Sequence, residues 1–260
     1  MEVLIRENAE AGCLLGARIL AKVLREKPAA VLGLATGRTP LRLYQELIRL
    51  HREESLDFSR VTTFNLDEYV GLPATHGQSY RHFMRENFFR HINIDPARTH
   101  VPDGAAADLQ AECRAYEERI AAAGGIDLQL LGLGRNGHIG FNEPTGSLGS
   151  RTWIKILSEQ TLRDNSAVFG SLATMPRHAI SMGVGTILDS RQLLLLAFGP
   201  AKVRAVVDMI EGPLAAVCPA SALQLHPRAI VVLDEASAAG LQYADHYRWV
   251  DRHKLDWQRF

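Results

Sequence analysis

The fold is decided by residues 127–144, which read Asp-Leu-Gln-Leu-Leu-Gly-Leu-Gly-Arg-Asn-Gly-His-Ile-Gly-Phe-Asn-Glu-Pro. The leucines at the start form a short apolar run bounded by glycines, which is typical of a strand buried on both faces of a parallel sheet. The later glycines let the backbone take positive φ and approach a ligand closely. His138 and Glu143 stand in this loop, at the strand end where open α/β sheets bind ligands. We therefore predict a functional loop directly after a central strand.

Three other interpretations of the loop have to be weighed. Gly132, Gly134 and Gly137 spell G-x-G-x-x-G, the dinucleotide-binding fingerprint, but that motif needs a helix after its third glycine to hold the pyrophosphate. Further glycines and Pro144 interrupt any such helix. A metal site at His138 and Glu143 lacks a third ligand at a recognisable spacing. A glycine-rich turn with a solvated histidine remains open on this loop alone, and we expect neither a cofactor nor a metal.

Strands alternate with helices on both sides of this loop. The pattern predicts one doubly wound, mostly parallel α/β domain over residues 1–260. Strands are expected at 29–34, 60–64, 128–133, 152–157, 179–184, 192–198 and 229–233. Helices are expected at 7–27, 40–50, 79–91, 107–123, 199–210, 221–226 and 243–257. The polar segment 158–178 follows the functional loop and is predicted to form a lid.

The composition excludes several classes of protein. The chain has 260 residues, 47% of them hydrophobic, and 29 basic side chains balance 29 acidic ones. It therefore lacks the basic footprint of a nucleic-acid binder. No apolar stretch approaches the roughly 18 residues that span a bilayer, and no signal peptide is recognisable. Cys13, Cys113 and Cys218 are few and far apart, which indicates reduced thiols and a cytoplasmic protein.

A second candidate site follows the strand at 29–34. Thr36, Gly37, Arg38 and Thr39 precede Pro40, with Thr39 as the expected N-cap and Pro40 as the first helical residue. Free backbone N–H groups at such a helix start suit a phosphate. The Walker spacing is absent, and a capped helix with an exposed arginine is the alternative.

Two further features suggest chemistry at strand ends. Asp67 and Glu68 follow the strand at 60–64, where adjacent acids either catalyse or cap the next element. Lys202 falls in the first turn of the helix at 199–210, where a cation opposes the helix dipole unless an anion offsets it. Together with the glycine loop, these residues indicate a small phosphorylated substrate that undergoes proton transfers.

Taken together, these segments resemble the glucosamine-6-phosphate deaminase family. The most specific matches are Thr-Phe-Asn-Leu-Asp-Glu-Tyr-Val-Gly-Leu at 63–72 and Gly-Arg-Asn-Gly-His-Ile-Gly-Phe-Asn-Glu-Pro at 134–144. Shorter matches lie at 36–40, 150–152, 183–186 and 223–227, in the family's order. The resemblance implies that glucosamine 6-phosphate is isomerised and deaminated to fructose 6-phosphate and ammonia in amino-sugar catabolism.

Roles for individual residues come from this resemblance. His138 would move a proton during ring opening, with Asn136 and Glu143 orienting its imidazole. Asp67 would be the base that removes the C2 proton, a step of the kind that contributes about 100- to 10,000-fold. The phosphate would be held by the backbone and side chains of Thr36, Gly37, Arg38, Thr39 and Lys202.

The sequence departs from the family at several positions. Asn136 is aspartate in many members, and an asparagine orients imidazolium without stabilising it as a charge. Arg38 replaces a glycine and adds a possible phosphate contact. The lid arginine of some members falls at Ala167, so Arg163 is the substitute that we consider. Gly146 and Trp153 replace two residues of the branch activated by N-acetylglucosamine 6-phosphate, so we expect no such activation.

Two rival functions remain. A 6-phosphogluconolactonase would hydrolyse a lactone without using Asp67 as a carbon base, although the ending Phe-Asn-Glu-Pro at 141–144 resembles the deaminase. A sugar-phosphate sensor would need an attached DNA-binding segment, whereas this sequence starts with the expected first helix. As partners we expect a small-molecule substrate, no nucleic acid and no membrane, with the protein a monomer or a small homo-oligomer.

Overall fold

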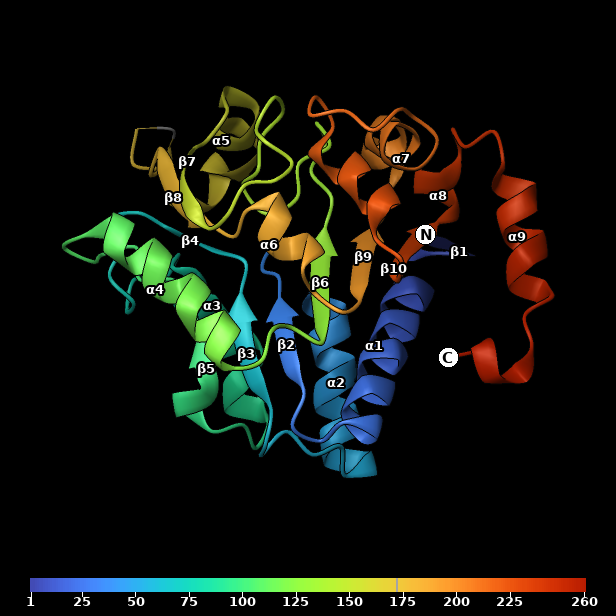
Figure 1. Ribbon diagram of the computed structural model, residues 1–260, viewed down its shortest axis with the longest axis horizontal. Helices are drawn as coiled ribbons and strands as arrows, with labels where there is room; N and C mark the ends of the chain where they lie inside the picture. Colours follow the sequence, from blue (N-terminus) through green and yellow to red (C-terminus); the bar gives the residue numbers. More distant parts are fainter. Residues whose placement is uncertain (172) are drawn as a thin grey trace.

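A seven-stranded parallel sheet forms the centre of the molecule in the computed structural model, which describes residues 1–171 and 173–260 (Figure 1). The strand order is β1-β10-β9-β6-β2-β3-β5, and every neighbouring pair is parallel. The strands are β1 (Glu2–Arg6), β2 (Val31–Leu34), β3 (Thr62–Asn65), β5 (Thr99–His100), β6 (Leu128–Gly132), β9 (Leu193–Ala197) and β10 (Ala229–Asp234). The predicted doubly wound α/β fold is confirmed.

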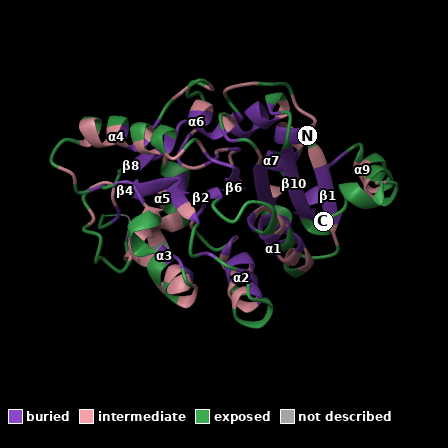
Figure 2. Cartoon of the chain, turned by 60° about the horizontal axis from the view of Figure 1, so that its bottom comes forward, coloured by how far each residue is buried: buried purple, intermediate pink, exposed green. Residues whose placement is uncertain are grey.

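Helices cover both faces of this sheet. In Figure 2, α1, α2 and α3 lie on one side of the buried strands, and α4, α6 and α7 lie on the other. The helices are α1 (Ala9–Glu26), α2 (Leu41–Glu54), α3 (Tyr80–Asn87), α4 (Leu109–Ala122), α5 (Glu159–Asn165), α6 (Val184–Leu188), α7 (Val203–Ile210), α8 (Glu235–Ala238) and α9 (Ala244–Arg252). Burial on both faces explains why β9 and β10 are apolar runs without alternation.

Short 3₁₀ helices complete several connections. They are η1 (Phe89–His91), η2 (Pro96–Arg98), η3 (Ser166–Phe169), η4 (Pro200–Lys202), η5 (Pro219–Leu225) and η6 (Asp256–Gln258). The expected helices at 221–226 and 243–257 therefore need correction. The first is the 3₁₀ helix η5, and the second ends at Arg252, with η6 following it.

A second, antiparallel sheet was not predicted. It has the order β4-β8-β7 and consists of β4 (Asp67–Tyr69), β7 (Trp153–Ile156) and β8 (His178–Ser181). The strands expected at 152–157 and 179–184 thus exist, but they belong to this smaller sheet. Its position at the molecular surface shows in β7, whose Trp153 and Ile156 are 44% and 73% exposed.

The small sheet has its own apolar core. Five buried side chains form it: Tyr69, Phe141, Leu157, Met175 and Ala179. Helix α5 lies in the chain between β7 and β8 and stands above the carboxyl ends of β2, β3 and β6 (Figure 1). The predicted lid at 158–178 thus lies next to the predicted site, and its residue 172 is outside the described part of the chain. Among the described helices, none is both long and apolar enough to cross a membrane.

Candidate active site

A cavity of about 220 Å³ lies where β2 and β6 end and where β4 begins. Six segments line it: the loop after β2, the start of β4, the start of α3, the glycine loop after β6, α5 and η4. Its polar lining residues include Thr36, Arg38, Thr39, Asp67, Tyr80, Arg135, His138, Thr161, Asp164, Asn165 and Lys202. Carboxyl ends of parallel strands are where ligands bind in open α/β folds.

The structure brings most of the predicted residues to this cavity. The predicted residues in its wall are Thr36, Gly37, Arg38, Thr39, Asp67, His138 and Lys202. Asn136 and Glu143 are not part of the wall. Asn136 forms hydrogen bonds with both His138 and Glu143, and Glu143 lies 3.7 Å from Nδ1 of His138. Arg163 does not line the cavity, because its side chain is 66% exposed and pairs with Glu159. Arg135, which was not predicted, lies in the wall instead.

A hydrogen-bonded chain orients His138. Its Nδ1 lies 2.6 Å from Oδ1 of Asn136, and Nδ2 of Asn136 donates to Oε2 of Glu143 over 2.8 Å. Because the amide oxygen can only accept, Nδ1 carries the proton and Nε2 has a free lone pair. Burial lowers the pKa of His138 and nearby Lys202 adds to this, whereas Glu143 opposes it. His138 is therefore a neutral base near pH 7.

Glu143 connects the hydrogen bonds of His138 and Asn136 to α5. Thr161 of α5 donates its hydroxyl to Oε1 of Glu143, and the backbone N–H of Ser158 donates to the same oxygen over 3.3 Å. Ser158 is also the N-cap of α5 and accepts from the backbone N–H of Thr161. The start of α5 and the orientation of His138 are thus linked through one carboxylate.

The glycine at 134 gives His138 its space. A Cβ atom at Gly134 would lie 2.4 Å from Nδ1 of His138, and the backbone N–H of Gly134 donates to the His138 carbonyl over 2.8 Å. The ring therefore packs directly on the loop backbone. Close packing against His138, and not nucleotide binding, therefore explains the second glycine of the G-x-G-x-x-G pattern.

Asp67 is a buried carboxyl in the wall of the same cavity. Burial and the neighbouring Glu68 raise its pKa to about 8. Glu68 itself points away and accepts hydrogen bonds from the backbone N–H groups of Tyr69, Tyr80 and Arg81. Glu68 therefore has a structural role, whereas the raised pKa of Asp67 suits proton exchange near neutral pH.

The loop after β2 lines the cavity and leads directly into the start of α2. Thr39 is not the N-cap that the sequence predicts; Pro40 takes that position, and no side-chain cap is formed there. The first turn of α2 is uncapped because proline has no side-chain acceptor. Gly37 has φ of 93°, which lets the loop turn at this point. Uncapped N–H groups at a helix start favour an anion.

Lys202 lines the same cavity as the loop at residues 36–39. Its ammonium donates to the carbonyl of Leu133 over 2.6 Å, and burial lowers its pKa. The bond to Leu133 keeps the ammonium group within the cavity wall. Among the described residues, no group of three or more His, Cys, Asp or Glu side chains could hold a metal.

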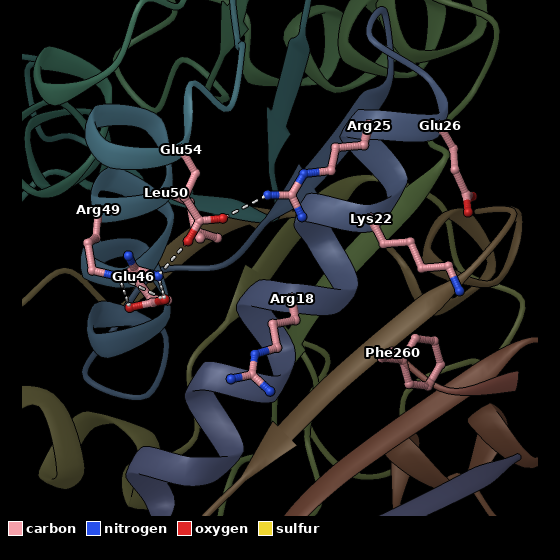
Figure 3. A pocket seen from close by; sticks show the side chains of 9 residues that line it. All are labelled: Arg18, Lys22, Arg25, Glu26, Glu46, Arg49, Leu50, Glu54 and Phe260. Atoms are coloured by element: carbon pink, nitrogen blue, oxygen red, sulfur yellow. Dashed lines mark hydrogen bonds and ion pairs between the residues drawn. The ribbon is translucent and has the colours of Figure 1, made fainter. Parts of the chain in front are cut away.

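Another cavity, of about 490 Å³, lies between α1, α2 and Phe260 (Figure 3). Two of its four cations form ion pairs, Arg49 with Glu46 and Arg25 with Glu54. It shares no lining residue with the cavity at Asp67. The smaller cavity therefore holds the candidate chemistry.

Comparison with known proteins identifies the family. The model of the family "Glucosamine-6-phosphate isomerases/6-phosphogluconolactonase" matches residues 6–232. The chain is 53% identical to glucosamine-6-phosphate deaminase of Hahella chejuensis, over 98% of this chain and 97% of that protein. It is 54% identical to the enzyme of the same name from Pseudarthrobacter chlorophenolicus, over 99% of each chain.

Solved structures give the same result. A monomeric glucosamine-6-phosphate deaminase superposes with a TM-score of 0.91 at 47% identity, covering 93% of this chain and all of that one. A 6-phosphogluconolactonase from Trypanosoma cruzi superposes with a TM-score of 0.73 at 19% identity, over 93% of this chain and 97% of that one, which shows a shared fold. The chain therefore belongs to the glucosamine-6-phosphate isomerase/6-phosphogluconolactonase family.

Proposed function

We propose that this protein is a glucosamine-6-phosphate deaminase, which converts glucosamine 6-phosphate and water into fructose 6-phosphate and ammonia. Its relatives at about half identity over their whole length carry that name. The observation that carries the proposal is that a buried carboxyl with pKa about 8, Asp67, and a neutral imidazole, His138, share one cavity with an uncapped helix start.

The sugar phosphate would enter with its phosphate between the loop at residues 36–39 and Lys202. Backbone N–H groups at the start of α2 and the nearby cations, Arg38 among them, favour a dianion at this end of the cavity. Binding there lies away from the reacting carbons. It would therefore position C1 and C2 and lower the entropic part of the barrier.

His138 would then open the sugar ring. Nε2 has the free lone pair, so it takes the proton of the C1 hydroxyl and delivers a proton to the ring oxygen. Asn136 keeps the proton on Nδ1, and Glu143 orients Asn136. Glu143 also lies 3.7 Å from Nδ1 of His138, close enough to stabilise the imidazolium that forms during transfer.

Asp67 would carry out the isomerisation. The C2 proton of the open aldehyde is acidic because it lies next to the carbonyl. The carboxylate removes it, and the ammonium group at C2 gives a proton to the carbonyl oxygen, which leaves an enol-amine. Return of that proton to C1 leaves an imine at C2, which water hydrolyses to the ketone and ammonia. The substrate's ammonium group lies beside C2, so its charge lowers the pKa of Asp67 and favours the basic form on binding.

The rival functions predict different products. A lactonase needs no carbon base, and a sensor releases nothing. Coupled detection of fructose 6-phosphate and ammonia from glucosamine 6-phosphate separates them, with Asp67→Asn as the comparison. Turnover by wild type that is lost in the variant supports the deaminase, whereas tight sugar-phosphate binding without turnover supports the sensor.

Organisation and location are part of the same proposal. We assign residues 1–260 to one catalytic domain with a lid at about 158–178, acting in the cytoplasm as a monomer or a small homo-oligomer. The described thiols Cys13, Cys113 and Cys218 are free and buried, in keeping with a reducing compartment. Addition of N-acetylglucosamine 6-phosphate should leave the sugar affinity unchanged, and a clear rise would contradict this.

A further inference from the structure

An ion pair joins the glycine loop to α5 across the mouth of the active-site cavity. Nε of Arg135 lies 3.0 Å from Oδ2 of Asp164, and Nη2 of Arg135 contacts the other oxygen. The guanidinium thus binds the carboxylate side-on through two hydrogen bonds. Phosphate oxygens accept from arginine in the same two-pronged geometry.

Both partners face the end of the cavity where the phosphate is proposed to bind. Arg135 and Asp164 line the same cavity as Lys202 and the loop at residues 36–39. The charge of Asp164 raises the pKa of Lys202 and that of Arg135 lowers it, so both lie within electrostatic reach of its ammonium. Three cations (Arg38, Arg135 and Lys202) therefore surround this end, and Asp164 is the anion among them.

The pair is held weakly enough to be exchanged. The side chains of Arg135 and Asp164 are 47% and 33% exposed, and ion pairs this accessible contribute little to stability. A phosphate monoester carries a charge of about −1.5 to −2 near pH 7, more than one carboxylate. A phosphate beside Lys202 would therefore attract Arg135 more strongly than Asp164 does, and it would repel Asp164.

We propose that Arg135 binds the substrate's phosphate and that Asp164 is an intramolecular competitor for the same guanidinium. On binding, the Arg135–Asp164 pair is replaced by an Arg135–phosphate pair. The inference deepens the proposed function, on which the identity of the phosphorylated ligand rests. It also gives α5 two different attachments: Thr161 stays on Glu143, while Asp164 leaves the glycine loop.

The test uses four variants of the full chain, of which Arg135→Lys keeps the charge at that position. Arg135→Ala removes the guanidinium, and Asp164→Asn keeps the shape of the competitor without its charge. Arg204→Ala is the matched control, because Arg204 is highly exposed and its Nε binds both carboxylate oxygens of Asp208 within α7. The measurements are kcat and KM for glucosamine 6-phosphate, and the Kd of inorganic phosphate by calorimetry.

Arg135→Ala is expected to raise both KM and the phosphate Kd about 10- to 100-fold, the range for a charged hydrogen-bonded contact. Asp164→Asn is expected to lower both about 3-fold, since the competitor is gone. Arg135→Lys should give intermediate values, because it keeps the charge and loses the two-pronged geometry. Arg204→Ala should match wild type in both measurements.

Two results would overturn the inference. Unchanged KM and phosphate Kd in Arg135→Ala would show that Arg135 does not touch the phosphate. Equal weakening by Arg135→Ala and Asp164→Asn would show that the pair is a structural clasp on α5 and not a competition. Failure of the proposed function would look different: wild type would release no ammonia, while the phosphate titrations would still report on Arg135.

Discussion

Asp67 and Glu68 are consecutive residues of β4, yet their carboxylates have opposite surroundings. Glu68 accepts three backbone hydrogen bonds, whereas no donor among the described residues reaches the carboxylate of Asp67. The alternation of side chains along a strand sends the two groups to opposite faces. One carboxyl therefore stabilises the fold, and the other meets the cavity without a partner.

The activity of the wild-type protein is expected to rise with pH. Asp67 must be ionised to act as a base, and its pKa is about 8. Below that pH, kcat/KM should rise up to tenfold per pH unit and then level off. The rise in kcat should occur at a lower pH than the rise in kcat/KM, because the ammonium group of the bound substrate favours the ionised form of Asp67. A profile of kcat/KM that is flat between pH 6 and 9 would contradict this assignment.

Replacement of Asp67 should stabilise the protein. The folded-state pKa of Asp67, about 8, lies above its ordinary value of 3.8, so the folded protein binds more protons than the unfolded chain between these values. Stability due to this group is therefore lost as the pH rises from about 4 to about 8. Asp67→Asn removes the effect, so its gain in Tm over wild type should be larger at pH 8 than at pH 5.

Each kcal/mol gained corresponds to about 2–4 °C in Tm for a domain of this size. Turnover of Asp67→Asn should fall by about 100-fold or more, as expected for loss of a general base. Calorimetric melting of wild type and variant at both pH values makes the comparison. An equal Tm difference at pH 5 and pH 8 would mean that Asp67 is not the buried, neutral carboxyl described here.

Thr161 is expected to act on His138 through Glu143. Thr161→Val keeps the shape of the side chain and removes the hydroxyl that Glu143 accepts. The carboxylate then turns more freely, so we expect kcat to fall about 10-fold with KM within about 3-fold, because a charge-assisted hydrogen bond is lost behind the reacting group. Thr161→Ser should restore kcat. A change in KM alone would assign Thr161 to substrate binding.

Gly134→Ala tests the packing of His138. The added Cβ would lie 2.4 Å from Nδ1 of His138, so the ring must move away from Asn136. We expect kcat to fall about 100-fold, as for loss of an oriented proton carrier. Gly149→Ala is the control, because its Cβ meets only the Ser147 hydroxyl at 3.8 Å. Equal kinetics of the two variants would show that ring position is not critical.

Much of the main sheet was predictable because its strands are buried on both faces. β6, β9 and β10 read as short apolar runs, which the sequence displays directly. β4 has three residues, two of them acidic, and this pattern does not predict a strand. β1 was also missed. Its apolar centre spans three residues before the helix at Ala9, too few for a periodicity to emerge.

The choice between two arginines shows what the sequence could not determine. Arg163 and Asp164 are neighbours on α5, and adjacent helical residues point about 100° apart. The helix is turned so that Asp164 faces the cavity and Arg163 faces solvent. That rotation depends on contacts of α5 with Glu143 and with the small apolar core, which come from distant parts of the chain. Arg135 could have been found by its place in the glycine loop, but its partner lies 29 residues away.

The small antiparallel sheet supports two parts of the active site on one apolar core. Asp67 begins β4, and α5 lies between β7 and β8, so Asp67 and a helix that lines the cavity rest on one apolar core. His138 and the start of α2 instead follow β6 and β2 of the parallel sheet. Phe141 of the glycine loop packs in the same core, and Glu143 links α5 to His138, so substitutions at Leu157 or Met175 would shift Asp67, α5 and the glycine loop together. Laboratory evolution toward other sugar phosphates should accumulate changes in this core, because one repacking event there adjusts both access and proton transfer.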